Sequence, residues 1–281
     1  VDGGPPRPAE FTLSDRGVSA SATALLLAAA CEGRSVIRET STELEVEDLI
    51  VFLRCLGADI ERDGRDVVVR GPIGRSGVVF PVPVDPVVIG TYGCAAAITG
   101  GRIVCRDAGD PDRLLPVTRA FEALGIAIDT RAGAYAISGR PTRGASLATG
   151  MFPEFFADLQ PPMTALMAVG AGESAIAETV YAARFDHVPG LRAMGAHIVL
   201  TERVMKIRPV EALRAIDAAG CGIRETASLL LAALAAEGTS TLSRIDALAR
   251  GYEGLPHALA ALGARIEFPL EEDTRDATLP L

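Results

Sequence analysis

The sequence predicts an α/β protein built from four copies of one helix–strand–helix–strand–strand unit. One phrase ends a helical pattern four times, as CLGADI, ALGIAI, AMGAHI and ALGARI, and its glycines recur every 68 to 70 residues, at Gly57, Gly125, Gly195 and Gly263. A second glycine precedes each of these by 23 to 25 residues, at Gly33, Gly101, Gly172 and Gly238. Two markers that keep one period over four copies indicate an internal repeat.

Each unit begins with a helix rich in alanine and leucine, which ends at the earlier glycine, a residue suited to a left-handed helix cap. These helices are apolar nearly all round, which is typical of buried helices. A short β-branched strand follows, such as RSVIRE. Because one unit leaves an apolar face uncovered, we expect several units to pack with these helices inside and the strands outside.

The second half of each unit is an amphipathic helix followed by a hairpin. The segment VEDLIVFLRCLG has apolar residues at helical spacing and ends in glycine. The segment ADIERDGRDVVVRG then places an Asp-Gly turn between two short strands. The order leaves room for one further strand ahead of the first helix.

Glycine- and proline-rich stretches divide the units. They lie at Gly71–Gly77, Gly139–Ser146 and Arg208–Gly220. These breaks assign residues 1–70 to one unit and residues 71–270 to three. The opening VDGGPPRPAE is expected to be loose or a linker, and residues 271–281 are expected to form a flexible tail because they are acidic and carry a proline near their end.

Composition excludes several classes of function. The 281 residues are 49% hydrophobic and carry a net charge of −9, which argues against a general nucleic-acid surface. Aromatic residues make up 5% and tryptophan is absent, so stacking platforms for single strands are not expected. No apolar stretch reaches the roughly 20 residues that span a bilayer. Five cysteines without a CxxC and three histidines without ligand spacing predict a reduced, cytoplasmic protein with no metal site.

The segments that enter the alanine-rich helices are polar, and helix N-termini attract anions. If the units pack around an axis, the N-termini of several of these helices converge on one pocket. Such a pocket suits a phosphorylated or carboxylated substrate. The segments are DRGVSAS, DPVVIGT, FADLQPP and GCGIRETAS.

Asp158 and three arginines are the candidate chemical groups. Asp158 precedes Pro161 and Pro162, so it is interpreted either as an N-cap or first-turn acid of a helix or as a general acid/base at a pocket mouth. Arg184, Arg224 and Arg250 lie near unit boundaries. A lone arginine is usually a solvated surface charge, but the guanidinium fork also suits carboxylate and phosphate.

Three long stretches resemble the enolpyruvyl transferases, above all the branch that uses UDP-N-acetylglucosamine in peptidoglycan precursor synthesis. The resemblance runs from about Phe11 to Phe268 and is carried by FADLQPPMTALMAVGAGESAIAETVYAARFDHVPGLRAMGAHI, GIRETASLLLAALAAEGTSTLSRI and ARGYEGLPHALAALGARI. It implies an inverse α/β barrel-like fold of six units in two domains. Residues 1–70 would be the last unit of a first, incomplete domain, and residues 71–270 the second domain.

The resemblance also implies an activity: enolpyruvyl transfer from phosphoenolpyruvate to a hydroxyl of a nucleotide or sugar nucleotide, without a cofactor. Asp158 matches the catalytic aspartate that takes the hydroxyl proton, and Arg250 joins Arg184 and Arg224 in gripping the phosphate and carboxylate of phosphoenolpyruvate. The remaining matched residues hold the nucleotide diphosphate or line the sugar-nucleotide site: Gly17, Val18, Ser19, Val180 and Tyr181.

The sequence departs from this family at several points. Four units stand where the family has six, so turnover would require the remaining units, in the same chain or in another one. The family's Asp-Arg-x-Glu reads DPVV, with Pro86 and Val88, and its acid two residues before Arg224 is Gly222. Two alternatives therefore stay open: a non-catalytic relative that binds a nucleotide or a protein partner, and an enolpyruvyl transferase with another acceptor, such as shikimate 3-phosphate or a nucleoside monophosphate.

Overall fold

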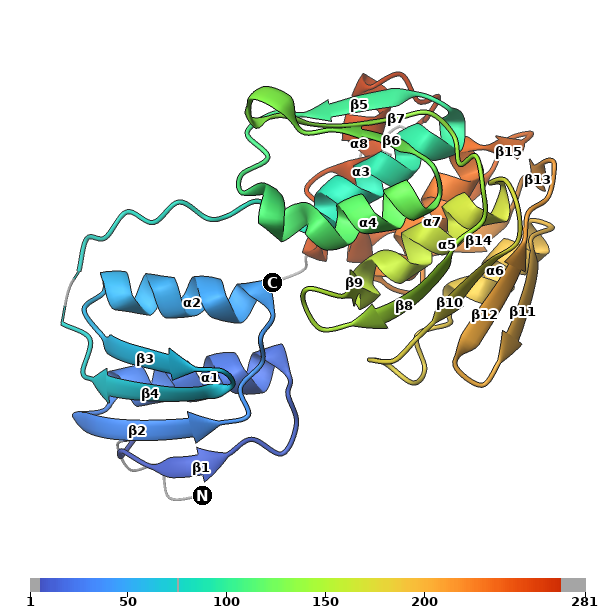
Figure 1. The fold of residues 1–281 in the computed structure, drawn as a ribbon. Coiled ribbons are helices and arrows are strands. Elements are labelled where there is room, and N and C mark those ends of the chain that lie inside the picture. The colour runs from blue at the N-terminus through green and yellow to red at the C-terminus, as the bar shows by residue number, and fades with distance from the viewer. Residues whose placement is uncertain (1–5, 75, 269–281) are drawn as a thin grey trace, which may run out of the picture.

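The computed structural model describes residues 6–74 and 76–268, so the expected tail at 271–281 lies outside the described residues. We call residues 6–74 the first module and residues 76–268 the second module. Figure 1 shows them side by side, joined by the turquoise connection that follows β4. The described residues of this connection form neither a helix nor a strand before α3.

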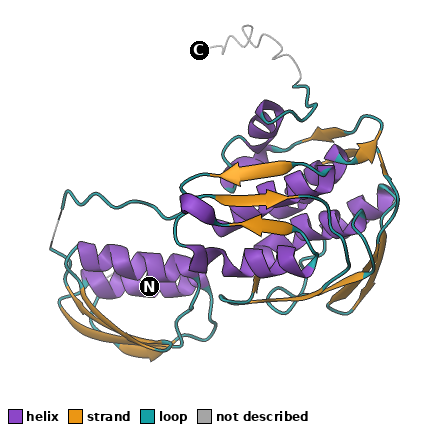
Figure 2. Cartoon of the chain, turned by 45° about the horizontal axis from the view of Figure 1, so that its top comes forward, coloured by secondary structure: helices purple, strands orange, loops and turns teal. Residues whose placement is uncertain are grey.

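The first module is one helix–strand–helix–strand–strand unit with a strand ahead of it. Its elements are β1 (Glu10–Thr12), α1 (Val18–Ala30), β2 (Gly33–Arg38), α2 (Leu44–Cys55), β3 (Asp59–Asp63) and β4 (Asp66–Gly71). The strand order is β1-β2-β4-β3, with β1 parallel to β2 and the other pairs antiparallel. Both helices lie on one face of this sheet (Figure 2). Leu25, Ile37 and Leu53 fill the space between them and are completely buried.

Three apolar helices form the centre of the second module: α3 (Pro86–Thr99), α5 (Gln160–Ala168) and α7 (Ile223–Leu234). Each of them packs against the other two. All nine residues of α5 are buried. The expectation that the alanine-rich helices lie inside and the strands outside is therefore confirmed for these three units.

Strands and amphipathic helices surround this centre. The first outer sheet has the order β5-β7-β6 and the second β11-β12-β10-β8-β9, and two strand pairs, β13-β15 and β14-β16, complete the layer. The strands are β5 (Arg102–Cys105), β6 (Ala127–Asp129), β7 (Tyr135–Ser138), β8 (Ser146–Gly150), β9 (Phe155–Phe156), β10 (Ser174–Ala177), β11 (His197–Thr201), β12 (Val204–Arg208), β13 (Leu213–Arg214), β14 (Asp217–Ala219), β15 (Ala236–Glu237) and β16 (Thr241–Ser243). The remaining helices are α4 (Leu115–Ala123), α6 (His187–Ala193) and α8 (Leu255–Ala261), and 3₁₀ turns lie at η1 (Pro111–Leu114), η2 (Arg131–Gly133), η3 (Ala157–Leu159) and η4 (Asp246–Arg250).

One expectation, for the first unit, is wrong. Helix α1 is not buried all round, because Leu26 and Leu27 are 50% and 53% exposed. The reason is that α1 has only its own sheet and α2 to pack against in the described chain, whereas α3, α5 and α7 cover one another. The hairpin expected after Gly263 in the fourth unit lies largely outside the described residues, and residues 264–268 form no strand.

Polar contacts join the two modules at the N-terminal part of α2. Asp48 on α2 accepts two hydrogen bonds of 2.8 Å from the guanidinium of Arg113 on η1, and both side chains are mostly buried. One turn earlier in the chain, the Glu43 carboxylate accepts a hydrogen bond of 3.2 Å from the backbone N–H of Phe152. A bidentate arginine–carboxylate pair fixes orientation as well as distance. The turn after β8 is thereby held against the start of α2.

The close contact between the backbone at Gly144 and the backbone at Glu173 can be tested through the stability of the protein. A Cβ at this position would lie 1.9 Å from the carbonyl oxygen of Glu173, which is backbone and cannot rotate away. We expect Gly144→Ala to lower the free energy of unfolding by about 1–3 kcal/mol, in the range of other overpacking changes. Urea denaturation measures the difference. The matched control is Gly74→Ala, whose Cβ meets nothing within 4 Å and should change stability by less than about 0.5 kcal/mol. Equal effects of the two changes would contradict this packing.

Candidate functional site

Asp158 does not cap a helix. It lies in η3, directly before α5, and the first turn of α5 contains Pro161 and Pro162, which have no backbone N–H to offer. Among the described residues, the hydrogen bonds to the carboxylate come from two arginine side chains. The N-cap alternative for Asp158 is therefore wrong, whereas its place in the first turn of η3 agrees with the first-turn alternative.

The Asp158 carboxylate lies between Arg184 and Arg224. Oδ2 accepts hydrogen bonds of 3.2 and 3.0 Å from Nε and Nη2 of Arg224, and Oδ1 accepts one from Nη1 of Arg184. The two arginine side chains are 15% and 20% exposed, whereas that of Asp158 is 38% exposed. The structure thus brings together three of the predicted residues, from the loop after β10, from η3 and from the start of α7.

Charge determines the protonation state of this cluster. Burial raises the pKa of Asp158, but the charges of Arg224 and Arg184 and their hydrogen bonds outweigh burial and hold the pKa below its usual value. The carboxylate is accordingly ionised at neutral pH. With both arginines bound to it, Asp158 is also a weaker proton acceptor than a free aspartate.

Tyr252 backs this cluster and was not identified from the sequence. Its ring lies 4.9 Å from the Cζ atom of Arg224, and its side chain is almost fully buried. The hydroxyl is 3.0 Å from Oγ1 of Thr91, which itself donates to the carbonyl of Val87 at 2.8 Å. The tyrosine hydroxyl must therefore donate to Thr91. Burial lowers the pKa of Arg224, but Tyr252 and Asp158 outweigh burial and raise it. The only sequence signal for Tyr252 is its place two residues after Arg250.

Two completely buried polar side chains shape the loop that carries Arg184. Oε1 of Glu178 accepts three hydrogen bonds of 2.8 Å, from Oγ1 of Thr149 and from the backbone N–H groups of Val180 and Tyr181. Gln160 donates to the carbonyl of Arg184 at 3.2 Å. Val180 and Tyr181 remain partly exposed, and the guanidinium of Arg184 lies 4.0 Å above the Tyr181 ring. The loop thus presents an aromatic face beside the charge cluster.

The other predicted residues lie apart from Asp158. Arg250 is exposed at the end of η4, and the Gly251 that follows it approaches Nη1 of Arg224 so closely that a Cβ there would lie 3.3 Å away. Gly17, Val18 and Ser19 open α1 in the first module. Among the described residues, no hydrogen bond or ion pair joins these four to Asp158.

A cavity of about 360 Å³ adjoins the cluster at Tyr252, which is one of its lining residues. Asp85, one of its lining residues, caps α3 by accepting hydrogen bonds of 2.7 and 3.3 Å from the N–H groups of Val87 and Val88. The wall is mostly apolar. It is formed by Val84, Asp85, Val88, Ile89, Tyr92, Tyr252 and Glu253.

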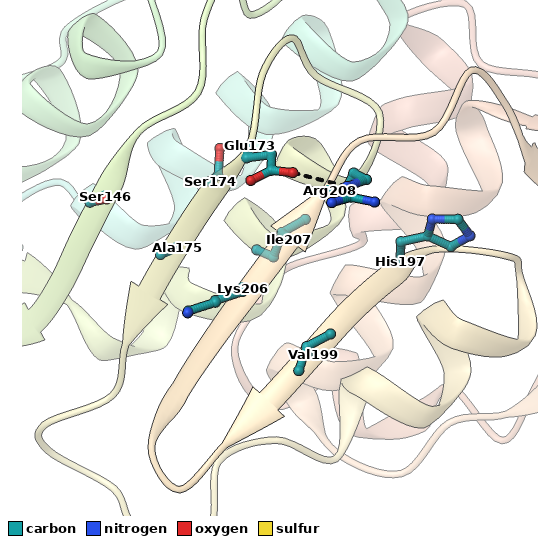
Figure 3. A pocket seen from close by; sticks show the side chains of 9 residues that line it. All are labelled: Ser146, Glu173, Ser174, Ala175, His197, Val199, Lys206, Ile207 and Arg208. Atoms are coloured by element: carbon teal, nitrogen blue, oxygen red, sulfur yellow. Dashed lines mark hydrogen bonds and ion pairs between the residues drawn. The ribbon is translucent and has the colours of Figure 1, made fainter.

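A wider depression of about 590 Å³ lies on the outer face of the β8–β10–β12–β11 sheet. Figure 3 shows its side chains rising from these strands, with Glu173 and Arg208 joined by an ion pair of 2.9 Å. Both partners are about 70% exposed, and the lining includes no member of the Asp158 cluster. Exposed ion pairs contribute little energy, so the Glu173–Arg208 pair does not mark a binding site. We regard this depression as the solvent-exposed face of a twisted sheet.

Residues 6–74 and 76–268 contain no group of three or more histidine, cysteine or acidic side chains placed to hold a metal ion. No helix in the same ranges is both long and apolar enough to cross a membrane.

Comparison with known proteins gives consistent similarities. Residues 4–259 match the family described as EPSP synthase (3-phosphoshikimate 1-carboxyvinyltransferase). A UDP-N-acetylglucosamine 1-carboxyvinyltransferase of Prochlorococcus marinus is 34% identical over 92% of this chain and 56% of its own length. The protein of the same name from Aeromonas hydrophila is 37% identical over 89% of this chain and 61% of its own. The chain thus spans about three fifths of the length of these curated relatives.

Solved structures support the fold. The crystal structure of the enolpyruvyl transferase NikO from Streptomyces tendae superposes with a TM-score of 0.81 at 27% identity, covering 92% of this chain and 65% of that one. An EPSP synthase from Acinetobacter baumannii gives a TM-score of 0.70 at 18% identity, over 93% of this chain and 64% of that one. The latter similarity concerns the fold alone.

His187, which opens α6 three residues after Arg184, gives this region a testable pH dependence. It is completely buried, neither ring nitrogen has a partner among the described residues, and burial lowers its pKa to about 3. Below about pH 6.5 the His187 imidazole takes up a proton in the unfolded chain but stays neutral in the folded protein. The free energy of unfolding therefore falls on acidification. At pH 5 the loss amounts to about 2 kcal/mol. Urea denaturation between pH 7 and 4.5 should show this slope for the wild type and a flatter one for His187→Leu. His197→Leu, at an exposed position, serves as the control, and equal slopes for both variants would contradict the assignment.

Proposed function

Because the chain belongs to the EPSP synthase family of enolpyruvyl transferases, we propose that it transfers the enolpyruvyl group of phosphoenolpyruvate to a hydroxyl of a sugar nucleotide. UDP-N-acetylglucosamine is the acceptor suggested by the names of the curated relatives. The observation that carries the proposal is the Asp158 carboxylate held between Arg184 and Arg224. This cluster supplies a carboxylate base and two guanidinium groups that can bind anions, and the proposed reaction uses both.

In the proposed reaction, the acceptor hydroxyl adds to C2 of phosphoenolpyruvate and phosphate then leaves. Asp158 takes the hydroxyl proton as the new C–O bond forms. Arg184 and Arg224 bind the carboxylate and phosphate oxygens, and Arg250 completes this anion site. Gly17, Val18, Ser19, Val180 and Tyr181 are proposed to hold the acceptor. Positioned acid–base groups typically contribute about 10²- to 10⁴-fold to the rate.

The contacts of this cluster also suggest how substrate would make Asp158 a better base. The carboxylate occupies the same guanidinium groups that an anionic substrate would bind. When phosphoenolpyruvate neutralises the arginines, Asp158 loses the two charges that hold its pKa down. Its affinity for a proton then rises in the complex, where the acceptor hydroxyl has to be deprotonated.

The cavity beside Tyr252 favours a second candidate, in which the acceptor differs from UDP-N-acetylglucosamine. Val84, Val88 and Tyr92 give this cavity an apolar wall at the start of α3. The same segment is where the sequence replaces the family's charged residues with Pro86 and Val88. Isothermal titration with UDP-N-acetylglucosamine, shikimate 3-phosphate and nucleoside monophosphates would separate the two candidates.

The test of the proposal is phosphate release from phosphoenolpyruvate in the presence of these acceptors. It should be run on the 281-residue chain and on the full encoded chain, because the relatives are longer. Acceptor-dependent release by either protein supports enolpyruvyl transfer. Binding of acceptor by both without any release would favour the non-catalytic alternative.

Asp158→Asn should abolish most turnover while phosphoenolpyruvate still binds. The amide cannot take the hydroxyl proton, but it leaves both guanidinium groups free for the substrate anion. We expect kcat to fall by at least about 100-fold, with the dissociation constant of phosphoenolpyruvate unchanged or lower. Phosphate release and calorimetry measure the two quantities. Turnover near the wild-type rate would show that Asp158 is only structural.

Arg250→Ala should weaken phosphoenolpyruvate binding more than acceptor binding. Arg250 is exposed, so its loss should leave the fold unchanged while it removes one charge from the anion site. Calorimetric titration with each ligand gives the two dissociation constants. Arg244→Ala, another exposed arginine, is the control. Equal weakening of both ligands by Arg250→Ala would exclude the role assigned to Arg250.

A further inference from the structure

A buried carboxyl group lies at the start of the loop that carries Arg184. The loop spans residues 178–186, between β10 and α6, and contains neither a helix nor a strand. Glu178 is 1% exposed, whereas Tyr181, three residues later, is 49% exposed. Backbone N–H groups that no helix or strand pairs need other acceptors. The side chain of Glu178 provides such an acceptor inside the protein for a loop whose middle lies on the surface.

One oxygen of Glu178 serves three donors. Oε1 accepts hydrogen bonds of 2.8 Å from the N–H groups of Val180 and Tyr181 and from the hydroxyl of Thr149 on β8. The same Thr149 hydroxyl accepts a hydrogen bond of 2.8 Å from the N–H of Thr179. Strand β8 pairs with β10, the strand that leads into the loop. Three consecutive N–H groups of the loop are therefore held against the sheet by two side chains.

The anchored backbone leads to Arg184 by way of Tyr181. The N–H of Arg184 donates to the carbonyl of Tyr181 at 3.3 Å, and the Arg184 Cζ atom lies 4.0 Å from the centroid of the Tyr181 ring. Gln160, two residues after Asp158, donates to the carbonyl of Arg184 at 3.2 Å. Arg184 in turn donates through Nη1 to Oδ1 of Asp158. The direction of the guanidinium thus depends on the backbone that Glu178 holds in place.

Burial of the Glu178 carboxyl group is unfavourable in itself. Its second oxygen, Oε2, is buried and has no hydrogen-bond partner among the described residues. A buried polar atom without a partner costs free energy. The three hydrogen bonds to Oε1 offset this cost, and two of their donors are backbone groups of the loop. What this buried group stabilises is therefore the conformation of the loop.

We propose that Glu178 is a positioning residue for binding of the substrate anion, because it fixes the loop so that Arg184 faces the site beside Asp158. The inference rests on the proposed enolpyruvyl transfer, in which Arg184 binds an anionic group of phosphoenolpyruvate. Glu178 acts through Tyr181 and Arg184 and touches no reacting atom. Loss of its oxygen leaves two N–H groups without their acceptor, so the loop adopts further conformations. The affinity for the anion then falls with the fraction of molecules that keep Arg184 in place.

Calorimetric titration of the full encoded chain with phosphoenolpyruvate tests this role with two variants at one position. Glu178→Ala removes the acceptor, and we expect the dissociation constant of phosphoenolpyruvate to rise by about 10-fold or more. Glu178→Gln keeps an oxygen for the three donors and should stay within about threefold of wild type. Glu173→Gln changes an exposed residue directly before β10 and serves as the control, with unchanged affinity. Wild-type affinity of Glu178→Ala would overturn the proposal.

A double-mutant cycle separates positioning from a general loss of structure. In an Arg184→Ala background, Glu178→Ala should weaken binding by less than about twofold further, because the guanidinium that it positions is already absent. Additive losses from the two changes would show a merely structural role and would overturn the proposal.

A second variant covers the case in which Glu178→Ala does not fold, as urea denaturation detects. Thr149→Val keeps the shape of the side chain but removes the hydroxyl that binds Glu178 and Thr179. We expect it to weaken phosphoenolpyruvate binding by about threefold or more in the wild-type background and by less than about twofold in the Arg184→Ala background. Unchanged affinity of Thr149→Val would then overturn the proposal.

Binding is measured without turnover, so failure of this inference differs from failure of the proposed function. If the wild type binds phosphoenolpyruvate but releases no phosphate with any acceptor, enolpyruvyl transfer fails, and the titrations still decide the role of Glu178. If the wild type releases phosphate while Glu178→Ala binds as tightly as wild type, the transfer stands and the positioning role fails. If the wild-type full chain does not bind phosphoenolpyruvate, both fail.

Discussion

The ion pairs of Asp158 with Arg184 and Arg224 depend on the close packing of α5 against α7. Asp158 directly precedes α5, and Arg224 belongs to the first turn of α7, so the distance between them is set by how the two helices meet. Ser228 on α7 donates a hydrogen bond of 2.7 Å to the carbonyl of Pro161, and both residues are completely buried or nearly so. This bond satisfies a carbonyl in the first turn of α5 and fixes one helix against the other at the level of the charges.

Such close packing requires small side chains in the centre of the second module. A Cβ on Gly90 of α3 would lie 2.6 Å from a methyl group of Leu159, next to Asp158. A Cβ on Gly190 of α6 would lie equally close to Leu229 of α7. The alanine and glycine content that marks these helices in the sequence is therefore a condition for the site: larger side chains would separate the helices and with them the carboxylate and the guanidinium groups.

The sequence predicted much of the fold because its signals are local. Glycines that follow helices recur at a fixed period, and each acts on its own neighbours along the chain. Asp158, Arg184 and Arg224 could be singled out because they stand at unit boundaries. Glu43 and Tyr252 could not, because their importance arises from contacts across units or modules, with Phe152 and with Thr91, that no spacing reveals. The exposure of Leu26 and Leu27 was missed for the same reason, since burial of α1 depends on what packs against it and not on its own composition.

A repeat fold distributes the chemical groups over several units, and only some of these units pack into one rigid core. Arg184 and Asp158 belong to one unit and Arg224 to the next, so the arrangement of these three is fixed within the rigid core of the second module. Glu43 belongs to the first module and reaches the second through a few polar contacts, chiefly its own bond to Phe152 and the pair between Asp48 and Arg113. Inter-domain contacts of this size are weaker than a packed core. Relative movement of the modules would therefore leave Asp158, Arg184 and Arg224 in place, because all three belong to the second module.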